Sequence, residues 1–232
     1  MIKIENYEVI GWEHAIRGMR NPMNSWGKSD SIFCKRTECA ECELKDNCKK
    51  DSLDFDIGAN DFKLMSTLAN NGSVHAKYRR MITVYVDITA PLYFWKEFDT
   101  YKVGTVANSC STMHKIADKE FTVNDFSHEH LTSQAIFLLL SVIEELNDVR
   151  ELYLQQDDKD VKKAYWWQMI QLLPSSYNQR RTIMLNYEVL ANIYKYRRNH
   201  KLDEWHYICD WIESLPHSEI ITCSIKETNK NG

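Results

Sequence analysis

Four cysteines lie within residues 34–48 in the spacing C-x4-C-x2-C-x5-C. They are Cys34, Cys39, Cys42 and Cys48. Thiolates at such a spacing can converge on one ion, and all-cysteine zinc sites and iron–sulfur clusters use the same four ligands. The sequence therefore predicts a metal site here, with zinc and iron–sulfur both open. The alternative is four reduced thiols in a loop, because the spacing matches no specific metal motif.

A second stretch able to do chemistry is "EFDTYKVGTVANSCSTMHKIA", residues 97–117. It gathers several hydroxyl side chains, an Asn, a thiol and a His around one Gly. Surface loops more often carry charge. Small residues allow close backbone approach to a ligand, and hydroxyls and backbone N–H groups can bind its polar atoms. We interpret the stretch as a candidate ligand-binding loop.

The elements that must position these residues mix one clear strand with several helices. In "MITVYVDITAP", Ile82, Val84, Val86 and Ile88 alternate with polar residues, which is typical of a strand with one buried face. Helical spacing predicts a long helix from Leu131 to about Leu154. Further helices are expected at 13–19, 61–71, 92–98, 177–198 and 203–214. The pattern predicts an α-rich α+β fold.

Length and composition indicate one domain over residues 1–216, with the Cys-rich stretch at about 31–57 as an insertion and 217–232 as a tail. A net charge of -4 gives no support to binding of polymeric nucleic acid or of a membrane surface. No segment approaches the roughly 18 apolar residues of a membrane span. We expect a cytoplasmic protein.

Two segments carry a resemblance to a known family. "APLYFWKEFDTYKVGTVANSCSTMHK" and "LPSSYNQRRTIMLNYEVLANIYKYR" resemble the signature regions of the flavin-dependent thymidylate synthases, and the similarity extends over roughly residues 61–214. The chain departs from the family where Arg-His-Arg becomes Thr100, Tyr101 and Lys102. It departs again where an Arg of the motif becomes Met113, and where an Arg three residues before the Leu of a Leu-Pro pair becomes Ile170.

The resemblance implies a ThyX-like fold and an enzyme that transfers one carbon from methylenetetrahydrofolate to C5 of dUMP or a related pyrimidine nucleotide. FAD would be the cofactor and NADPH the reductant, and the family's homotetramer would place active sites between subunits. Arg197 would act in catalysis and contact the substrate. The nucleotide would also meet Glu97, Ser109 and Ser111. Flavin contacts would come from Thr100, Tyr101, Lys102, Thr105, Asn108, Asn186, Asn192 and His200.

One geometric expectation accompanies the second segment. If 177–198 is a single helix, Asn186 and Arg197 lie about three turns apart on one stripe. The lost arginines favour an alternative function, in which a catalytically altered or inactive protein binds a nucleotide or a partner on the same scaffold. An Arg fork is not replaced by the point charge of a Lys.

Overall fold

The computed structural model describes residues 2–33 and 55–223. Cys34, Cys39, Cys42 and Cys48 therefore lie outside the described residues, and their metal site stays a prediction. Contacts divide the chain into two compact units. Unit 1 comprises Met1–Glu8, Tyr85–Met184 and His200–Ile208, and unit 2 comprises Val9–Val84, Leu185–Asn199 and Cys209–Gly232. The single domain expected for residues 1–216 also stays a prediction.

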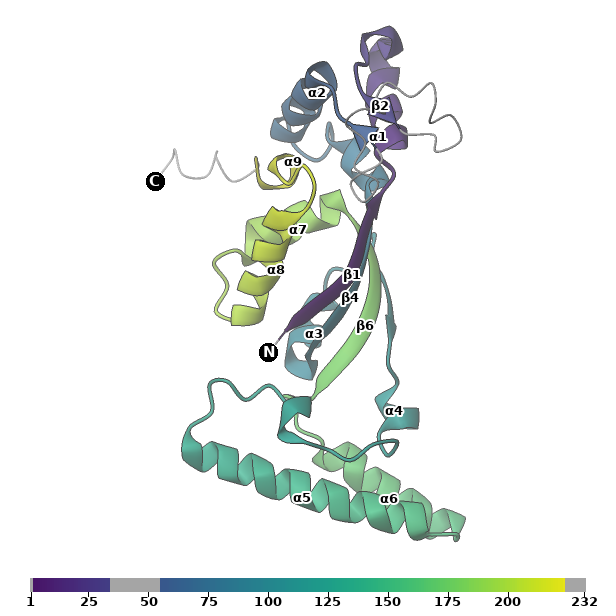
Figure 1. The fold of residues 1–232 in the computed structure, drawn as a ribbon, viewed down its shortest axis with the longest axis vertical. Coiled ribbons are helices and arrows are strands. Elements are labelled where there is room, and N and C mark those ends of the chain that lie inside the picture. The colour runs from purple at the N-terminus through teal and green to yellow at the C-terminus, as the bar shows by residue number, and fades with distance from the viewer. Residues whose placement is uncertain (1, 34–54, 224–232) are drawn as a thin grey trace, which may run out of the picture. The chain divides into compact units, whose positions relative to one another are not determined.

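A small sheet accompanies the helices and confirms the α+β fold class (Figure 1). Its strand order is β1 (Lys3–Ile10), β4 (Thr83–Pro91), β6 (Asn178–Asn186) and β5 (Val106–Ser109). Strand β5 pairs antiparallel with β6, so that Val106 lies opposite Met184. The alternation expected for β4 is confirmed, because its apolar side chains at 84, 86 and 88 are buried.

Unit 1 adds α3 (Leu92–Phe98), α4 (Thr112–Lys115), the 3-10 turn η4 (Val123–Asp125), α5 (Ser133–Gln155) and α6 (Lys159–Leu172). Helices α5 and α6 pack side by side (Figure 1). Leu139, Ile143 and Leu146 of α5 share a buried cluster with Met169 of α6. Helix α5 confirms the predicted long helix, whereas α6 was not expected. None of the helices in the described ranges combines the length and apolar character that a membrane crossing requires.

Unit 2 contains α1 (Trp12–Arg20), η1 (Asn21–Met23), η2 (Trp26–Lys28), β2 (Ile32–Phe33), β3 (Phe55–Asp56), α2 (Ala59–Asn70), η3 (Lys77–Met81), α7 (Tyr187–Arg197) and α9 (Glu219–Thr222). Helix α8 (Asp203–Ser214) contributes residues to both units. Helix α9 occupies the stretch interpreted as the start of a tail. It forms because Ile220 and Ile221 are both buried, and burial of two large apolar side chains stabilises the turn.

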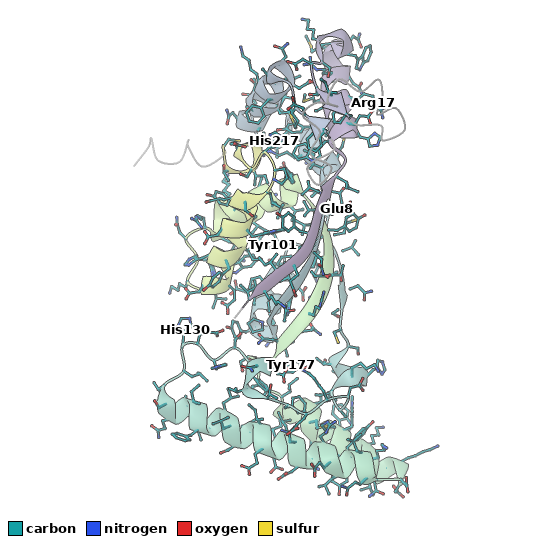
Figure 2. The ribbon with its side chains drawn as sticks, in the orientation of Figure 1. Glu8, Arg17, Tyr101, His130, Tyr177 and His217 are labelled. Atoms are coloured by element: carbon teal, nitrogen blue, oxygen red, sulfur yellow. The ribbon has the colours of Figure 1, made fainter. Side chains whose placement is uncertain are left out.

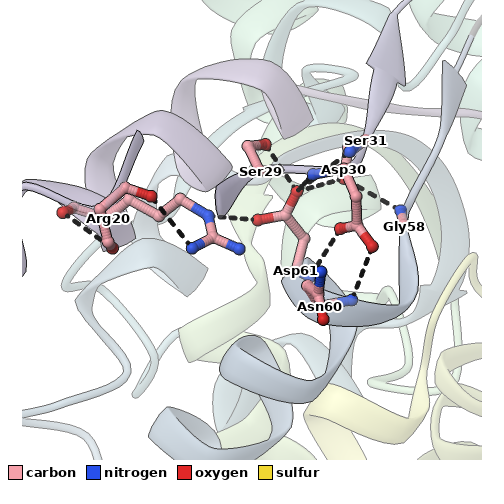
Figure 3. A network of polar contacts seen from close by, with 8 residues as sticks. Arg20, Ser29, Asp30, Ser31, Gly58, Asn60 and Asp61 are labelled. Carbon is pink, nitrogen blue, oxygen red and sulfur yellow. Dashed lines mark hydrogen bonds and ion pairs between the residues drawn. The ribbon is translucent and has the colours of Figure 1, made fainter. Parts of the chain in front are cut away.

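A buried carboxylate organises the entry to α2 (Figure 3). Asp61 Oδ1 accepts a 2.6 Å hydrogen bond from Arg20 Nε. Its Oδ2 accepts from the hydroxyls of Ser29 and Ser31, each at 2.7 Å, and from two backbone N–H groups. Asp30 in turn accepts from the backbone N–H groups of Asn60 and Asp61 in the first turn of α2. The network fixes the segment 29–31 against α2.

The helix expected over 177–198 is wrong in its first half. Residues 178–186 form β6, and Asn186 is the N-cap of α7, where its side-chain oxygen accepts from the N–H groups of Glu188 and Val189 at 3.1 Å. Asn186 and Arg197 consequently do not share a helical stripe. The strand forms because Gln179, Ile183 and Leu185 alternate into the core at a period of two.

Candidate functional site

Unit 1 contains a cavity of about 770 Å³, a size typical of small-molecule sites. The segment after β5 and the beginning of β6 contribute to its wall, together with residues around η4 and the start of β1. Its lining residues are Ile2, Lys3, Thr89, Cys110, Ser111, Thr112, Lys115, Lys119, Asn124, Asp125, Phe126, His128, Glu129, Tyr177, Asn178, Gln179 and Arg180. We call it the large cavity. Of the residues assigned to the substrate from sequence, Ser111 lines it.

The candidate ligand-binding loop is held rigidly at this wall. The Cys110 N–H donates to the Arg180 carbonyl at 2.9 Å, and the Gln179 side-chain amide donates to the Cys110 carbonyl at 2.8 Å. Ser111 caps α4 by accepting from the His114 N–H at 3.2 Å. The Trp166 indole N–H then donates to the Met113 carbonyl at 2.9 Å. The backbone of 110–113 is thus fixed before any ligand arrives.

Four Lys and Arg side chains line the large cavity, and each has an acidic partner. Lys115 contacts Asp118 at 2.8 Å, and Lys3 contacts Glu5 at the same distance. Lys119 pairs with Asp125, and Arg180 pairs with Asp87 at 2.7 Å. These are cations held in place at the surface of a cavity, and an anionic ligand could replace or share their partners.

The carboxyl groups of two of these partners are held ionised. Burial alone would raise the pKa of Asp125, but hydrogen bonds from Lys119 and Thr122 outweigh it and lower the pKa below its usual value. Hydrogen bonds from Asn6, Thr182 and Arg180 likewise lower the pKa of Asp87. Both carboxylates therefore keep their charge through the neutral range and continue to orient the neighbouring cations.

An aromatic pair supplies the flat, apolar part of the large cavity. The rings of Phe126 and Tyr177 lie 5.6 Å apart in an edge arrangement, and an antiparallel bridge joins their backbones. Figure 2 labels Tyr177. Burial raises the pKa of its phenol, so the ring stays neutral. With the amides of Asn124, Asn178 and Gln179 nearby, the wall offers ring contacts and hydrogen bonds at one place.

Three of the sequence-predicted residues meet in a second cluster of unit 1. His200 Nε2 lies 3.3 Å from Glu97 Oε2, and the Trp205 indole N–H donates to the same oxygen at 3.1 Å. The Leu202 N–H donates to His200 Nδ1 at 3.1 Å, so a neutral His200 carries its proton on Nε2, toward Glu97. Tyr101, labelled in Figure 2, completes the cluster with its ring 5.8 Å from that of Trp205.

The remaining sequence-predicted residues of unit 1 lie between Thr100 and Ser109. The Thr100 hydroxyl donates to the Glu97 carbonyl at 2.8 Å, and Lys102 is exposed. Asn108 and Ser109 lie on exposed strand β5, opposite Thr182 and Arg181.

Some of these residues carry polar atoms and rings that a flavin could contact. The buried Thr105 hydroxyl oxygen has no hydrogen-bond partner among the described residues, which is uncommon for a buried polar atom and is consistent with a missing ligand. Tyr101 adds a ring, whereas both His200 nitrogens already have partners in Glu97 and the Leu202 N–H. Thr105 and Tyr101 offer a flavin a hydroxyl and a ring, with Lys102 as the single cation where the family has two arginines.

Unit 2 holds the other predicted residues. Arg197 is the last residue of α7, half-buried, and Asn192 lies on the same helix. Asn192 lines a cavity of about 270 Å³, which we call the small cavity. Asn186 uses its side-chain oxygen as the cap of α7. Within the two described ranges, no group of three or more His, Cys, Asp or Glu side chains could hold a metal ion.

Several residues that supply charge, amide groups and an aromatic ring to the large cavity were not predicted from the sequence. Arg180, Gln179 and Tyr177 were placed in the first half of the helix expected over 177–198, which is not helical, and Lys119 was not singled out. The available signal was the alternation of Gln179, Ile183 and Leu185, which would have identified β6 and turned attention to its first residues.

Similarity to known proteins is confined to solved structures. No family model matches the chain, and no curated protein sequence matches it significantly. A structure of the flavin-dependent thymidylate synthase ThyX from Helicobacter pylori, complexed with FAD and dUMP, aligns with a TM-score of 0.61 at 14% identity, covering 96% of this chain and 98% of that one. A second structure of that enzyme aligns with a TM-score of 0.63 at 14% identity, covering 97% of this chain and 98% of that one.

The UMP/dUMP methylase PolB from Streptomyces cacaoi, bound with 5-Br dUMP, aligns with a TM-score of 0.54 at 11% identity, covering 92% of this chain and 89% of that one. At these identities the likeness shows the fold. The described fold is therefore ThyX-like.

Proposed function

We propose that this chain, with its ThyX-like fold, binds a pyrimidine nucleotide in the large cavity and transfers a one-carbon unit from methylenetetrahydrofolate to C5 of dUMP or a related nucleotide. One observation carries the proposal: the candidate loop, four ordered cations and an aromatic pair line a single cavity. The solved structures with this fold that contain dUMP or 5-Br dUMP support it.

The chemistry of the wall matches the parts of a nucleotide. A phosphate is satisfied by cations and hydroxyl donors, which Lys115, Lys119 and Ser111 offer. A pyrimidine ring is satisfied by an aromatic neighbour and by amides at its edge. Tyr177 and Gln179 supply these groups. Ser109, the last residue of β5 within the candidate loop, would approach the nucleotide with its backbone.

FAD would be held in unit 1 by Tyr101, Thr105 and His200, with Thr100, Lys102 and Asn108 at the border of the same set. Asn186 and Asn192, which the resemblance assigns to the flavin, lie in unit 2, and their role stays a prediction. When bound, the flavin supplies the redox step of the transfer, with NADPH as reductant.

The chain's own groups bind, orient and polarise. Arg197, in unit 2, stays the predicted catalytic residue, and Glu97 would orient His200 by accepting from its Nε2–H. In the homotetramer that we propose, active sites would lie between subunits.

The test combines binding and turnover in the full chain. Absorption spectra with FAD, followed by dUMP titration, should show retained flavin bands that shift with the nucleotide. Release of tritium from C5-labelled dUMP, with methylenetetrahydrofolate and NADPH present, then measures turnover. No dUMP binding at all would overturn the assignment of the large cavity.

A charge variant tests the wall itself. Lys115→Gln should weaken dUMP binding about fivefold, because one phosphate contact is lost. Lys96→Gln is the matched control, since Lys96 is an exposed residue of α3 that does not line the cavity. Equal affinities of the two variants would contradict the placement of the phosphate.

A second function is favoured by one specific departure. Lys102 alone replaces the basic part of Arg-His-Arg, and its point charge cannot reproduce a bidentate fork. A nucleotide-binding protein without turnover would bind dUMP, fail to retain FAD and release no tritium, which separates it from the enzyme.

A further inference from the structure

The small cavity of unit 2 surrounds a thiol with an unusual neighbour. Cys223, at the end of α9, lines the cavity of about 270 Å³. Arg79 donates a hydrogen bond to Cys223 Sγ at 3.2 Å, while the thiol itself lies 3.6 Å from the Ile220 carbonyl. A guanidinium directed at sulfur, together with partial exposure, is the environment in which protein thiols react.

The polar groups around this thiol are not fully satisfied. Arg79 is 2% exposed and Glu188 is 7% exposed, yet the closest approach of their charged groups is 3.6 Å. Arg79 Nε and Glu188 Oε2 have no hydrogen-bond partner among the described residues. Buried polar atoms are nearly always paired in folded proteins, so these two atoms mark an incompletely satisfied charged pair at the wall of the cavity.

The charge of the cavity wall selects the kind of partner. Lys195 lines the small cavity with Arg79, and Glu188 is its one acidic lining residue. The wall therefore carries net positive charge and attracts anionic molecules. Asn70, Ser73 and Asn192 add neutral hydrogen-bonding groups.

The other two described cysteines lack this combination. Cys209 is fully buried, and burial raises the pKa of its thiol to about 12, so it is inert. Cys110 is exposed and lines the large cavity, but no cation donates a hydrogen bond to its sulfur among the contacts of the described residues. Cys110 is thus a natural internal comparison for Cys223.

We propose that Cys223 is a modification site that forms a mixed disulfide with small anionic disulfides, whose carboxylates bind Arg79 and Lys195. The Cys223 sulfur gives its proton to solvent and attacks one sulfur of the reagent. A new S–S bond forms, the reagent's S–S bond breaks, and the second half leaves as a thiolate. The thiol is oxidised and half of the reagent is reduced. Asn192 of this cavity is also among the residues assigned to the flavin, so the test uses the chain without added FAD.

The experiment compares an anionic with a neutral disulfide on the full chain. The probes are 5,5′-dithiobis(2-nitrobenzoate), with two carboxylates, and 2,2′-dithiodipyridine. Peptide mapping by mass spectrometry after timed quenching gives the rate at each cysteine separately. Cys223 should react with the anionic probe about tenfold faster than Cys110 does, and the neutral probe should show a smaller difference.

Variants assign the preference to the two cations. Lys195→Met should slow the anionic probe severalfold at Cys223, and Lys63→Met, an exposed change on α2 away from the cavity, should not. Arg79→Met combined with Glu188→Gln removes the buried pair as a unit, so that no charge stays buried alone. It should abolish the preference for the anionic probe.

Two results would overturn the proposal. One is a Cys110 rate equal to or above that of Cys223 with the anionic probe. The other is a Cys223 rate that is the same in the wild-type chain, in the Lys195 variant and in the folded double variant.

Discussion

Removing the carboxylate of Asp61 should destabilise the protein strongly, because this side chain is fully buried and accepts hydrogen bonds from a buried arginine. Asp61→Ala leaves Arg20, which is 4% exposed, without its ion partner at 2.6 Å. Breaking a buried pair in this way costs about 3–5 kcal/mol. The hydroxyls of Ser29 and Ser31 can turn to other partners, so we expect a loss of about 4 kcal/mol of unfolding free energy.

The assay is urea unfolding, monitored by circular dichroism. The dependence of the unfolding free energy on urea concentration should be the same in wild type and variants. Asp56→Ala is the matched control, since Asp56 is exposed in β3, and it should change the stability by less than about 0.5 kcal/mol. A loss below about 1 kcal/mol for Asp61→Ala would refute the reasoning that the network is buried and paired.

The pH dependence of this contribution has a definite sign. Burial alone would raise the pKa of Asp61, but hydrogen bonds from Ser29, Ser31 and Arg20 outweigh it and lower the pKa below the unfolded value of 3.8. A depressed pKa in the folded state stabilises the fold above the unfolded pKa. The stability difference between wild type and Asp61→Ala should therefore be constant above that value and shrink as the pH falls below it.

Two further substitutions test the core and the start of α7. Leu146→Ala should cost about 2–5 kcal/mol in urea unfolding, because Leu146 is fully buried in the α5 and α6 cluster, whereas Leu138→Ala, 66% exposed on the same helix, should cost less than about 0.5 kcal/mol. Asn186→Ala should cost about 1 kcal/mol and speed hydrogen exchange at the Glu188 and Val189 amides, with Asn186→Ser restoring most of the loss. Unchanged exchange there would contradict the cap.

Patterns of side chains predicted those elements whose periodicity is strong. The strict alternation of β4 and the apolar stripe of α5 were sufficient, because each buries one face against a core. Strand β5 could not be found in this way, since all four of its residues are exposed and their order carries no burial signal. Its position follows from pairing with β6, which is a tertiary interaction.

The residues of the candidate site likewise fall into two groups: those that local sequence predicts and those that depend on tertiary pairing. Ser111 could be predicted because the loop that contains it has an unusual composition. Arg180 could not, because its role depends on a strand register and on Asp87 of a neighbouring strand. The Asn186 cap was available in the sequence, as an Asn two residues before an acidic side chain, but the helical pattern of α7 was extended backward through it.

The antiparallel pair β2 and β3 has a consequence for protein engineering. Phe33 and Phe55 lie opposite each other, with their rings 5.9 Å apart, so the two described ranges end and begin at one point. The Asp61 network anchors the strand on one side of that point. Each doubling of a flexible loop costs only about 0.6 kcal/mol when its ends are already fixed together. A reporter domain whose own termini are adjacent should therefore be tolerated between these two residues.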